Sequence, residues 1–279
     1  MPTYEQLLDQ AEPARRRIDA ADRPRLAVGI DTSSIAVGAL DTLAALRQAD
    51  DAAGVSVSVD RAGGNGLSFA NPVVELTTPD GTRILYQRVK AADAAEFVQT
   101  VLVRREAANR WTLGSINGSV DGVTSLDSFD WWTLQRRRLM TEMGVIDPEN
   151  IDEALARGAY KGLAKALTMT QEEVIAEVSG SKLSGRSGGF FPTGRKWDFL
   201  RTSPTNPKAM VCNADEGDPG AWVNRMTMEN DPHALIEGIT IGGWATGAVR
   251  GYIYIREEYP LAFERVVNAI EQAEANASR

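Results

Sequence analysis

The sequence predicts an α/β protein with two domains, and three observations lead to this prediction. The chain has 279 residues, 43% of them hydrophobic, which is enough for a sizeable core and for more than one domain. Its first hundred residues alternate between strand-like and helix-like apolar runs. Its second half carries a glycine-rich loop with cations, followed by an apolar strand and a short acidic turn. Alternating strands and helices of this kind are typical of layered α/β folds.

The N-terminal elements follow the order β-α-β, hairpin, helix, after a leading charged helix. The expected elements are a helix over 4–20, a buried strand over 26–30, a helix over 36–48, a strand over 55–60, strands over 73–77 and 83–86, and a helix over 91–102. Pro79-Asp80-Gly81 supplies the hairpin turn between the last two strands. This order is that of a small thioredoxin-like domain.

The middle of the chain is expected to connect two domains. Residues 105–126 have little apolar periodicity and contain Gly-Ser-Ile-Asn-Gly-Ser, which indicates a linker or surface loop. A helix is predicted over 127–143, with Trp131 and Trp132 as packing anchors. We therefore place the domains at 1–104 and 146–279, with 105–145 as linker and helix. Further on, the Thr170-to-Glu173 spacing predicts a capping box for a helix that runs to residue 178.

Composition and charge exclude several classes of function. The formal net charge is −8 and no block of lysine and arginine stands out, so nucleic-acid binding is not expected. No apolar stretch reaches the length of a membrane helix, and the first residues lack the pattern of a signal peptide. The single cysteine, Cys212, excludes an internal disulfide and a cysteine-ligated cluster held by this chain alone. We therefore expect a cytoplasmic protein without direct membrane insertion.

Residues 185–197 form the glycine-rich run, Gly-Arg-Ser-Gly-Gly-Phe-Phe-Pro-Thr-Gly-Arg-Lys-Trp. The backbone amides of such a loop, with the amino end of a following helix, cradle phosphate groups that the cations neutralise. Arg186 and the amides of Gly185, Ser187 and Gly188 are suited to this role. The run therefore predicts a site for a phosphorylated cofactor.

Residues 212–220, Cys-Asn-Ala-Asp-Glu-Gly-Asp-Pro-Gly, form the acidic turn, which we expect a buried strand to deliver. Carboxylates and an asparagine amide bind ribityl, ribose or amide groups by hydrogen bonds. Together with the glycine loop, the turn indicates a nucleotide cofactor. Three nearby residues are interpreted as structural: Cys212 as an inert core thiol, Trp197 as a packing residue, and His233 as a hydrogen-bonding residue rather than a catalytic acid.

The two runs resemble the FMN- and NADH-binding flavoprotein subunit of respiratory complex I. That family's loop reads roughly Gly-Arg-Gly-Gly-Ala-Gly-Phe-Pro-Thr-Gly-x-Lys-Trp and is followed by Cys-Asn-Ala-Asp-Glu. The same subunit type occurs in NAD-linked hydrogenases and in NAD-linked formate dehydrogenases. The likeness begins near residue 144 and continues through 228–233, 235–238 and 251–256, about the last half of the chain. It implies a Rossmann-like α/β FMN-binding domain after the thioredoxin-like one.

The resemblance also implies an activity and a set of contacts. Hydride passes between NAD(H) and FMN, electrons leave singly through iron–sulfur centres elsewhere in a complex, and no catalytic residue or metal is needed beyond the flavin. Among the possible complexes we favour a formate dehydrogenase over a hydrogenase or a complex I-like assembly. The implied FMN contacts are Gly185, Arg186, Ser187, Gly188, Lys196, Asn213, Asp215 and Glu216. The implied NADH contacts are Phe191, Phe199 and Asp218, and the two phenylalanines are suited to stack on adenine.

Three residues in the matched region depart from the family's pattern. Ser187 replaces a glycine and adds a hydroxyl, while Phe190 stands where the family has glycine or alanine and either narrows the nicotinamide channel or fills a gap. Asp218 replaces the usual glutamate and shortens a carboxylate that contacts NADH in the family. None of these changes is expected to abolish the function by itself.

Larger departures concern the iron–sulfur centres. Related flavoproteins often hold a [2Fe-2S] cluster on four cysteines of the thioredoxin-like domain, and the pattern falls here on Gly29, Ser34, Gly64 and Ser68. The family also continues past the helix expected over 260–275, with a Gly-Glu-Glu loop over the flavin, a ubiquitin-like domain and a [4Fe-4S] domain. We therefore expect a clusterless first domain and a C-terminally incomplete FMN-binding domain, either as a fragment or as half of a split subunit.

Three other interpretations stay open. A scaffold or assembly module that has lost part of the flavin site explains the missing cysteines, although it has no need for Arg186 and Lys196. The segment 29–33, Gly-Ile-Asp-Thr-Ser, matches the phosphate loop of a sugar-kinase-like ATPase, but the later elements of that fold are not visible. A free NAD-binding regulator requires a Gly-x-Gly-x-x-Gly turn between a strand and a helix, which the glycines at 63, 64 and 66 do not provide.

Overall fold

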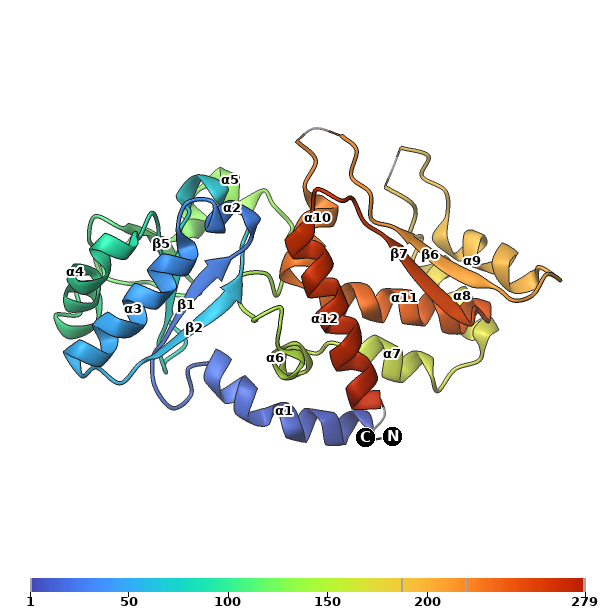
Figure 1. Ribbon diagram of the computed structural model, residues 1–279, viewed down its shortest axis with the longest axis horizontal. Helices are drawn as coiled ribbons and strands as arrows, with labels where there is room; N and C mark the ends of the chain where they lie inside the picture. Colours follow the sequence, from blue (N-terminus) through green and yellow to red (C-terminus); the bar gives the residue numbers. More distant parts are fainter. Residues whose placement is uncertain (1, 187, 219, 278–279) are drawn as a thin grey trace.

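The computed structural model describes residues 2–186, 188–218 and 220–277, and places a five-stranded sheet unit beside a helical unit with a two-stranded sheet (Figure 1). Helix α1 (Tyr4–Ile18) leads in and runs beneath both units in that view. It packs on α6 (Ile151–Ala156) through Ala11, Ile151 and Leu155, so the first helix of the chain contacts the start of the second half. The start of α1 and the end of α12 (Pro260–Ala277) lie close together (Figure 1).

The N-terminal unit has the predicted order of elements. Its strands and helices are β1 (Arg25–Ile30), α2 (Thr32–Ile35), α3 (Ala39–Ala53), β2 (Ser58–Gly63), β3 (Val74–Thr77), β4 (Arg83–Tyr86), α4 (Ala94–Val98) and β5 (Thr112–Ile116). The strand order is β2-β1-β3-β4-β5, with β1 and β2 parallel and the remaining pairs antiparallel. A parallel β-α-β pair extended by an antiparallel hairpin is the thioredoxin-like arrangement, which confirms the predicted fold of this unit.

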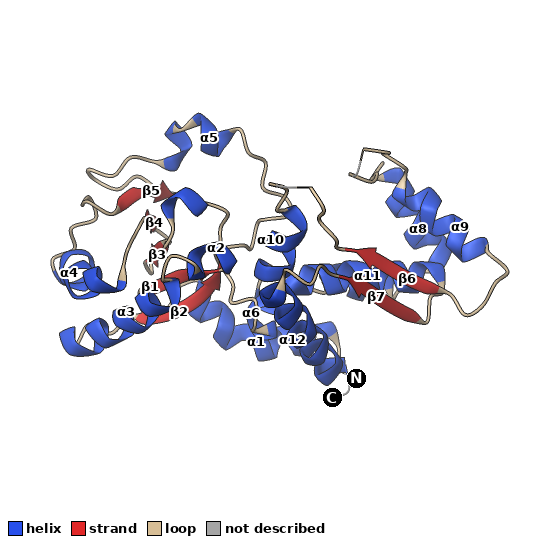
Figure 2. Ribbon diagram, turned by 45° about the horizontal axis from the view of Figure 1, so that its top comes forward, coloured by secondary structure: helices blue, strands red, loops and turns tan. Residues whose placement is uncertain are grey.

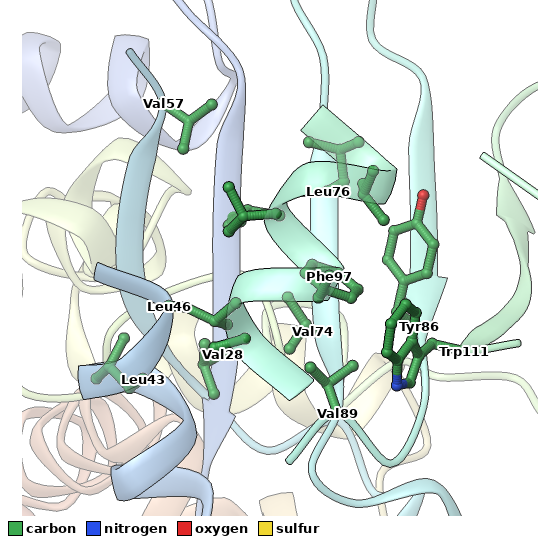
Figure 3. Packing of buried hydrophobic residues seen from close by; sticks show 14 of the residues in the cluster. Val28, Leu43, Leu46, Val57, Val74, Leu76, Tyr86, Val89, Phe97 and Trp111 are labelled. Carbon is green, nitrogen blue, oxygen red and sulfur yellow. The ribbon is translucent and has the colours of Figure 1, made fainter. Parts of the chain in front are cut away.

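The core of this unit lies between the sheet and helices α3 and α4. The apolar residues of β1, β3 and β4 meet Leu43 and Leu46 of α3 and Phe97 of α4 on that face (Figure 3). The Phe97 ring packs edge-on against Tyr86 at 5.1 Å and against Trp111 at 5.4 Å between ring centroids. Edge-to-face pairs contribute about 0.5–1.5 kcal/mol each beyond the area they bury. The aromatic trio therefore fixes α4 on the sheet.

The predicted linker 105–126 contains a strand. Strand β5 pairs with β4 from Ile116↔Arg83 to Thr112↔Tyr86 and completes the sheet. The strand escaped prediction because its apolar content is slight and Gly114 interrupts it. That glycine is required by packing, since a Cβ there would lie 2.6 Å from Leu126 Cδ2. The strand is held by its neighbours rather than by its own propensity.

The long helix predicted over 127–143 is also absent. Within this range the structure has one short helix, α5 (Asp130–Thr133), after a 3₁₀ turn at Leu126–Ser128. Trp132 does act as the expected anchor, because it packs on the second face of the sheet with Leu126. The Arg137 guanidinium lies 4.0 Å from the centroid of the Trp132 ring, and burial lowers its pKa. This arginine therefore packs on the face of the tryptophan ring.

The C-terminal unit surrounds a two-stranded sheet with helices. Its elements are α7 (Lys161–Ala166), α8 (Gln171–Gly180), α9 (Thr193–Thr202), β6 (Ala209–Asn213), α10 (Val223–Asn230), α11 (Pro232–Thr246), β7 (Arg250–Tyr254) and α12 (Pro260–Ala277). Strands β6 and β7 are parallel, with Cys212 opposite Ile253. The capping box predicted for α8 is present, since Thr170 and Glu173 exchange side-chain-to-backbone hydrogen bonds.

Strand β6 was expected to be buried, and the structure corrects this. Only alternate residues point into the unit, where Cys212 and Ile253 pack with Met228 and Val266. On the opposite face Val211, Tyr252 and Tyr254 are 62%, 52% and 65% exposed. Parallel sheets are normally covered on both faces, so an apolar strand sequence by itself suggests full burial. Here one face is uncovered in the described chain.

The two units meet along the end of α10. The backbone N–H and the hydroxyl of Thr32 both donate to the Glu229 carboxylate, at 2.8 and 2.6 Å. The backbone N–H of Gly64 donates to Asn230 Oδ1 at 2.5 Å. Glu229 and Asn230 are almost fully buried, with exposed fractions of 1% and 0%. These hydrogen bonds connect the start of α2 and the segment after β2 to the C-terminal unit.

Gly194 sets how closely α8 and α9 approach. A Cβ at this position would lie 2.1 Å from Ser179 Oγ and 2.8 Å from Ser179 N, and the backbone atom cannot rotate away. We expect Gly194→Ala to lower the free energy of unfolding by about 1–3 kcal/mol, the usual cost of overpacking. Gly180→Ala is the matched control, because nothing lies within 4 Å of its Cβ. Urea unfolding curves that coincide for the two variants would contradict this packing.

Candidate functional site

The glycine-rich loop is a hairpin-like excursion between α8 and α9. Its base is closed by hydrogen bonds from Gly185 N to Phe191 O and from Thr193 N to Leu183 O, both 2.9 Å. Gly188 has φ +89°, a backbone conformation in which a side chain is strained. Arg186 is exposed and forms no ion pair with a described residue. The loop thus presents backbone amides and a free cation at the amino end of α9.

Helix α9 carries the next group of predicted contacts. Lys196 is exposed on its first turns and has no carboxylate partner among the described residues. Phe191 and Phe199 are 41% and 55% exposed, with ring centroids 6.2 Å apart. The Arg195 guanidinium lies 5.9 Å from the Phe191 centroid and 5.3 Å from that of Phe199. The structure therefore brings the two phenylalanines together with a cation that the sequence analysis had not assigned.

The acidic turn begins where β6 ends. Asn213 is the last residue of the strand, and its side-chain oxygen accepts a hydrogen bond from Asp215 N at 3.2 Å. Asn213, Asp215 and Asp218 are all exposed. Arg256, which follows β7, holds the turn in place by donating to the Glu216 carbonyl at 2.7 Å. Arg256 is a second residue missed from the sequence, because its partner is 40 positions away.

Glu216 has a different environment from the other predicted flavin contacts. Its carboxylate is buried and accepts hydrogen bonds from Asn224 N at 2.9 Å and Arg225 N at 3.1 Å. These amides belong to the first turn of α10, where backbone N–H groups lack helical partners. Both carboxylate oxygens are thus used to cap the helix. A ligand that bonded Glu216 would compete with this cap.

The loop and the turn project on the same side of the β6–β7 sheet (Figures 1 and 2). The turn leaves the carboxyl end of β6, and the loop lies at the amino end of α9. In open α/β sheets, ligands bind outside the carboxyl ends of the strands. One further predicted contact, Ser187, lies outside the described residues. The predicted cations belong to the loop and α9, and the predicted carboxylates belong to the turn.

The three residues interpreted as structural have structural surroundings. Trp197 packs in the cluster of α8 and α11. Cys212 is half-buried, and burial raises the pKa of its thiol. His233 is fully buried, its Nδ1 lies 2.9 Å from the Tyr160 hydroxyl, and burial lowers its pKa to about 4. A neutral, enclosed imidazole fits a hydrogen-bonding role.

Of the four positions of the family's cluster pattern, Gly29 lies in β1, Ser34 in α2, Gly64 just after β2 and Ser68 in a 3₁₀ turn. Gly29 and Gly64 are neighbours, since a Cβ on Gly29 would lie 3.7 Å from Gly64 Cα. A Cβ on Gly64 would lie only 1.9 Å from Asp31 Oδ2. The Asp31 side chain caps α2 through Ser34 N at 2.8 Å. Across the described residues no trio of histidine, cysteine or acidic side chains is arranged to hold a metal ion, and no helix has the length and apolarity to cross a membrane.

The second half of the chain is similar in sequence to known proteins. Residues 178–278 match the family model described as the Nuo51 FMN-binding domain. The NADP-reducing hydrogenase subunit HndC of Solidesulfovibrio fructosivorans is 50% identical over 139 residues, which are 50% of this chain and 28% of that protein. An NADH-quinone oxidoreductase subunit of Aquifex aeolicus (strain VF5) is 50% identical over 124 residues, 44% of this chain and 29% of that protein. The matches thus span less than a third of each relative.

Among solved structures, an NAD⁺-reducing [NiFe]-hydrogenase in the air-oxidised state is similar over 95% of this chain and 48% of the hydrogenase chain, with 19% identity and a TM-score of 0.40. The glycine loop, α9, the acidic turn and strand β7 all fall within the matched range 178–278. After its thioredoxin-like unit, this chain therefore carries the start of an FMN-binding domain of the Nuo51 family.

Proposed function

We propose that the chain supplies one wall of the FMN- and NAD(H)-binding site of a diaphorase, the flavoprotein subunit of a larger iron–sulfur redox complex. The proposal rests on two cations, Arg186 in the glycine loop and Lys196 on α9, that form no ion pair with any residue the structure describes. The loop lies toward the carboxyl end of the parallel strands β6 and β7. Of the two relatives named above, one is a subunit of a hydrogenase and one of a quinone oxidoreductase, and their names refer to NADP and NADH.

The described residues fit a flavin mononucleotide. The phosphate group requires several N–H donors and positive charge, which the amides of Arg186, Gly188 and Gly189 and the side chains of Arg186 and Lys196 offer. The Gly185 amide, which was expected to contribute, is already bonded to Phe191 O. Asn213 and Asp215 offer exposed oxygens and an amide to the ribityl hydroxyls. When bound, FMN supplies the exchange between two-electron hydride transfer and one-electron transfer. The protein's part is to neutralise the phosphate and to orient the ring.

The NAD(H) side of the proposed site consists of Phe191, Phe199 and Asp218. The exposed faces of the two rings are suited to an adenine base, because stacking requires only a flat π-surface. Asp218 offers an exposed carboxylate to a ribose or amide group of the dinucleotide. No general base is assigned, since hydride transfer to a flavin does not need one.

A second polypeptide or segment completes the pocket in this proposal. The outward face of β6 and β7 carries exposed Val211, Tyr252 and Tyr254, as expected of a parallel sheet that lacks one of its covering layers. The completing part would carry electrons onward through an iron–sulfur centre, such as the [4Fe-4S] cluster implied by the family. Of the possible complexes we favour an NAD-dependent formate dehydrogenase, because the thioredoxin-like unit on the same chain has no cluster cysteines.

The test is an FMN titration of the purified chain, alone and after co-expression with the product of the adjacent downstream gene. We expect tight binding in the pair, and at least about tenfold weaker binding for Lys196→Ala, since a hydrogen bond to a charged group is worth about 1.5–3 kcal/mol. Lys161→Ala, an exposed lysine on α7, is the matched control.

Two outcomes would overturn the proposal. Absence of FMN binding both alone and in the pair would leave the scaffold interpretation, which the capping role of Glu216 favours. Equal FMN affinity for Lys196→Ala and Lys161→Ala would remove Lys196 from the site. Near-ultraviolet circular dichroism of each variant would show that the fold is unchanged.

A further inference from the structure

Arg195 lies where a flat ligand is expected. Phe191 lies just before α9, whereas Arg195 and Phe199 lie on the helix one turn apart. The two rings have their centroids 6.2 Å apart, with the arginine beside both. Its guanidinium stands 5.3–5.9 Å from both ring centroids. A guanidinium is planar and stacks on aromatic faces much as a base does. A base entering between these rings displaces the arginine toward the edge of the base.

The surroundings of Arg195 carry uncompensated positive charge. A groove of about 450 Å³ runs between α8 and α9, and Lys182 and Arg195 both line it. Neither cation is paired with a carboxylate of the described chain. The acidic residues that line the groove, Glu172 and Asp198, both bond Arg201, at 2.6 and 3.0 Å. Within the described part of the chain, the groove therefore has two cations without an ion-pair partner, whereas each of its carboxylates already bonds Arg201 through one oxygen.

This distribution of charge favours a ribose that carries a 2′-phosphate over a ribose with a free 2′-hydroxyl. A free 2′-hydroxyl is typically recognised by a carboxylate, whereas a 2′-phosphate is accommodated by a nearby arginine. Arg201 bonds one oxygen of each of these carboxylates and offsets part of their charge, so the charge that lines the groove is positive overall. A guanidinium is suited to a phosphate because it donates two parallel hydrogen bonds.

We propose that Arg195, supported by Lys182, is a specificity-determining residue that binds a phosphate on the 2′-position of the adenosine ribose, so that the site accepts NADP(H) in addition to NAD(H). The inference rests on the proposed function, in which Phe191 and Phe199 stack on adenine. The stacked base moves the guanidinium off the rings, and the ribose attached to that base carries its 2′-phosphate into reach. The apolar floor of the groove, with Ile175 and Leu183, holds the sugar edge.

The experiment compares two probes by isothermal titration calorimetry on the co-expressed pair: adenosine 2′,5′-bisphosphate and adenosine 5′-monophosphate. Wild type is expected to bind the bisphosphate at least about tenfold more tightly, the effect of one charge-assisted phosphate contact. Arg195→Met should reduce this preference below about threefold while it changes 5′-monophosphate affinity little. Arg250→Met, an exposed arginine on β7, is the control that should leave both affinities unchanged.

Several results would overturn the inference. Equal affinity of wild type for the two probes would do so, as would an equal loss of both affinities in Arg195→Met, which would make the arginine a stacking partner only. FMN binding without binding of either probe would also overturn it while the flavin part of the proposed function stands. An Arg195-dependent preference for the bisphosphate in a preparation that binds no FMN would support the inference and refute the flavin site.

Discussion

Arg265→Ala is expected to lower the free energy of unfolding by about 3–5 kcal/mol, the cost of removing one partner from a buried ionic network. Arg265 is 1% exposed on α12, and burial lowers its pKa. Its Nη1 donates to the carbonyls of Ile30, at 2.9 Å, and of Glu229, while Nε pairs with Glu149 at 3.3 Å. One side chain thus bonds the end of β1, the end of α10 and the segment before α6.

The substitution leaves buried carbonyls without a donor where the two units meet. An unsatisfied buried polar group costs about 1–3 kcal/mol, and the lost side chain adds a cavity. Urea unfolding followed by far-ultraviolet circular dichroism measures the effect. Glu264→Ala, exposed on the same helix, should stay within about 0.5 kcal/mol of wild type. A loss below about 1 kcal/mol for Arg265→Ala would contradict this role, because the contact between the two units would then not depend on the arginine.

Asp231→Asn is expected to stabilise the protein near pH 7 by up to about 3 kcal/mol. Burial raises the pKa of Asp231 from 3.8 to about 6, so the folded state holds the proton more tightly than the unfolded state does. The free energy of unfolding therefore falls as pH rises from about 4 to about 6. Asparagine removes the buried charge and keeps an oxygen for the capping bond to Ala234 N.

His233, two residues later, has the opposite dependence. Its pKa falls from 6.5 to about 4 on folding, so the unfolded state takes up the proton first and stability is lost as pH drops through this window. Between about pH 4 and pH 6 the slopes of Asp231 and His233 oppose each other. In wild type the two effects largely cancel there.

The opposing pH dependences of Asp231 and His233 are tested by urea unfolding at about pH 4.5, 5.5 and 7 for wild type, Asp231→Asn and His233→Gln. Relative to wild type, Asp231→Asn should lose free energy of unfolding as the pH falls. The pH dependence that His233 contributes is then no longer opposed by that of Asp231. His233→Gln should gain stability relative to wild type as the pH falls. Differences that are constant across the three pH values would contradict the assigned protonation states.

The sequence predicted the helices, strands and turns that depend on short-range patterns. It did not predict the fifth strand of the N-terminal sheet or the exposed face of β6 and β7. The β-α-β order, the hairpin at Pro79-Asp80-Gly81 and the capping box at Thr170 all depend on short-range patterns, and the structure confirms them. Strand β5 was missed because it is short and interrupted by Gly114. Its pairing with β4 and the packing of Leu113 and Ile116 near Leu126 hold it in the sheet.

The candidate site shows the same limit. The motif resemblance picked out the glycine loop and the acidic turn, and the structure places both at one end of the β6–β7 sheet. The roles of Glu216 and Arg256 were not visible, since a helix cap and a loop anchor depend on residues that the fold brings together. The contacts proposed for FMN and NAD(H) remain predictions for binding measurements.

The uncovered face of β6 and β7 has a consequence for how the protein is made. Each strand has one unpaired edge in the described chain, and edges of this kind recruit other strands. With Val211, Tyr252 and Tyr254 facing solvent, free chains are expected to compete with the proposed partner for the same surface. We expect synthesis in step with that proposed partner, at matched amounts, to keep the surface from pairing with itself.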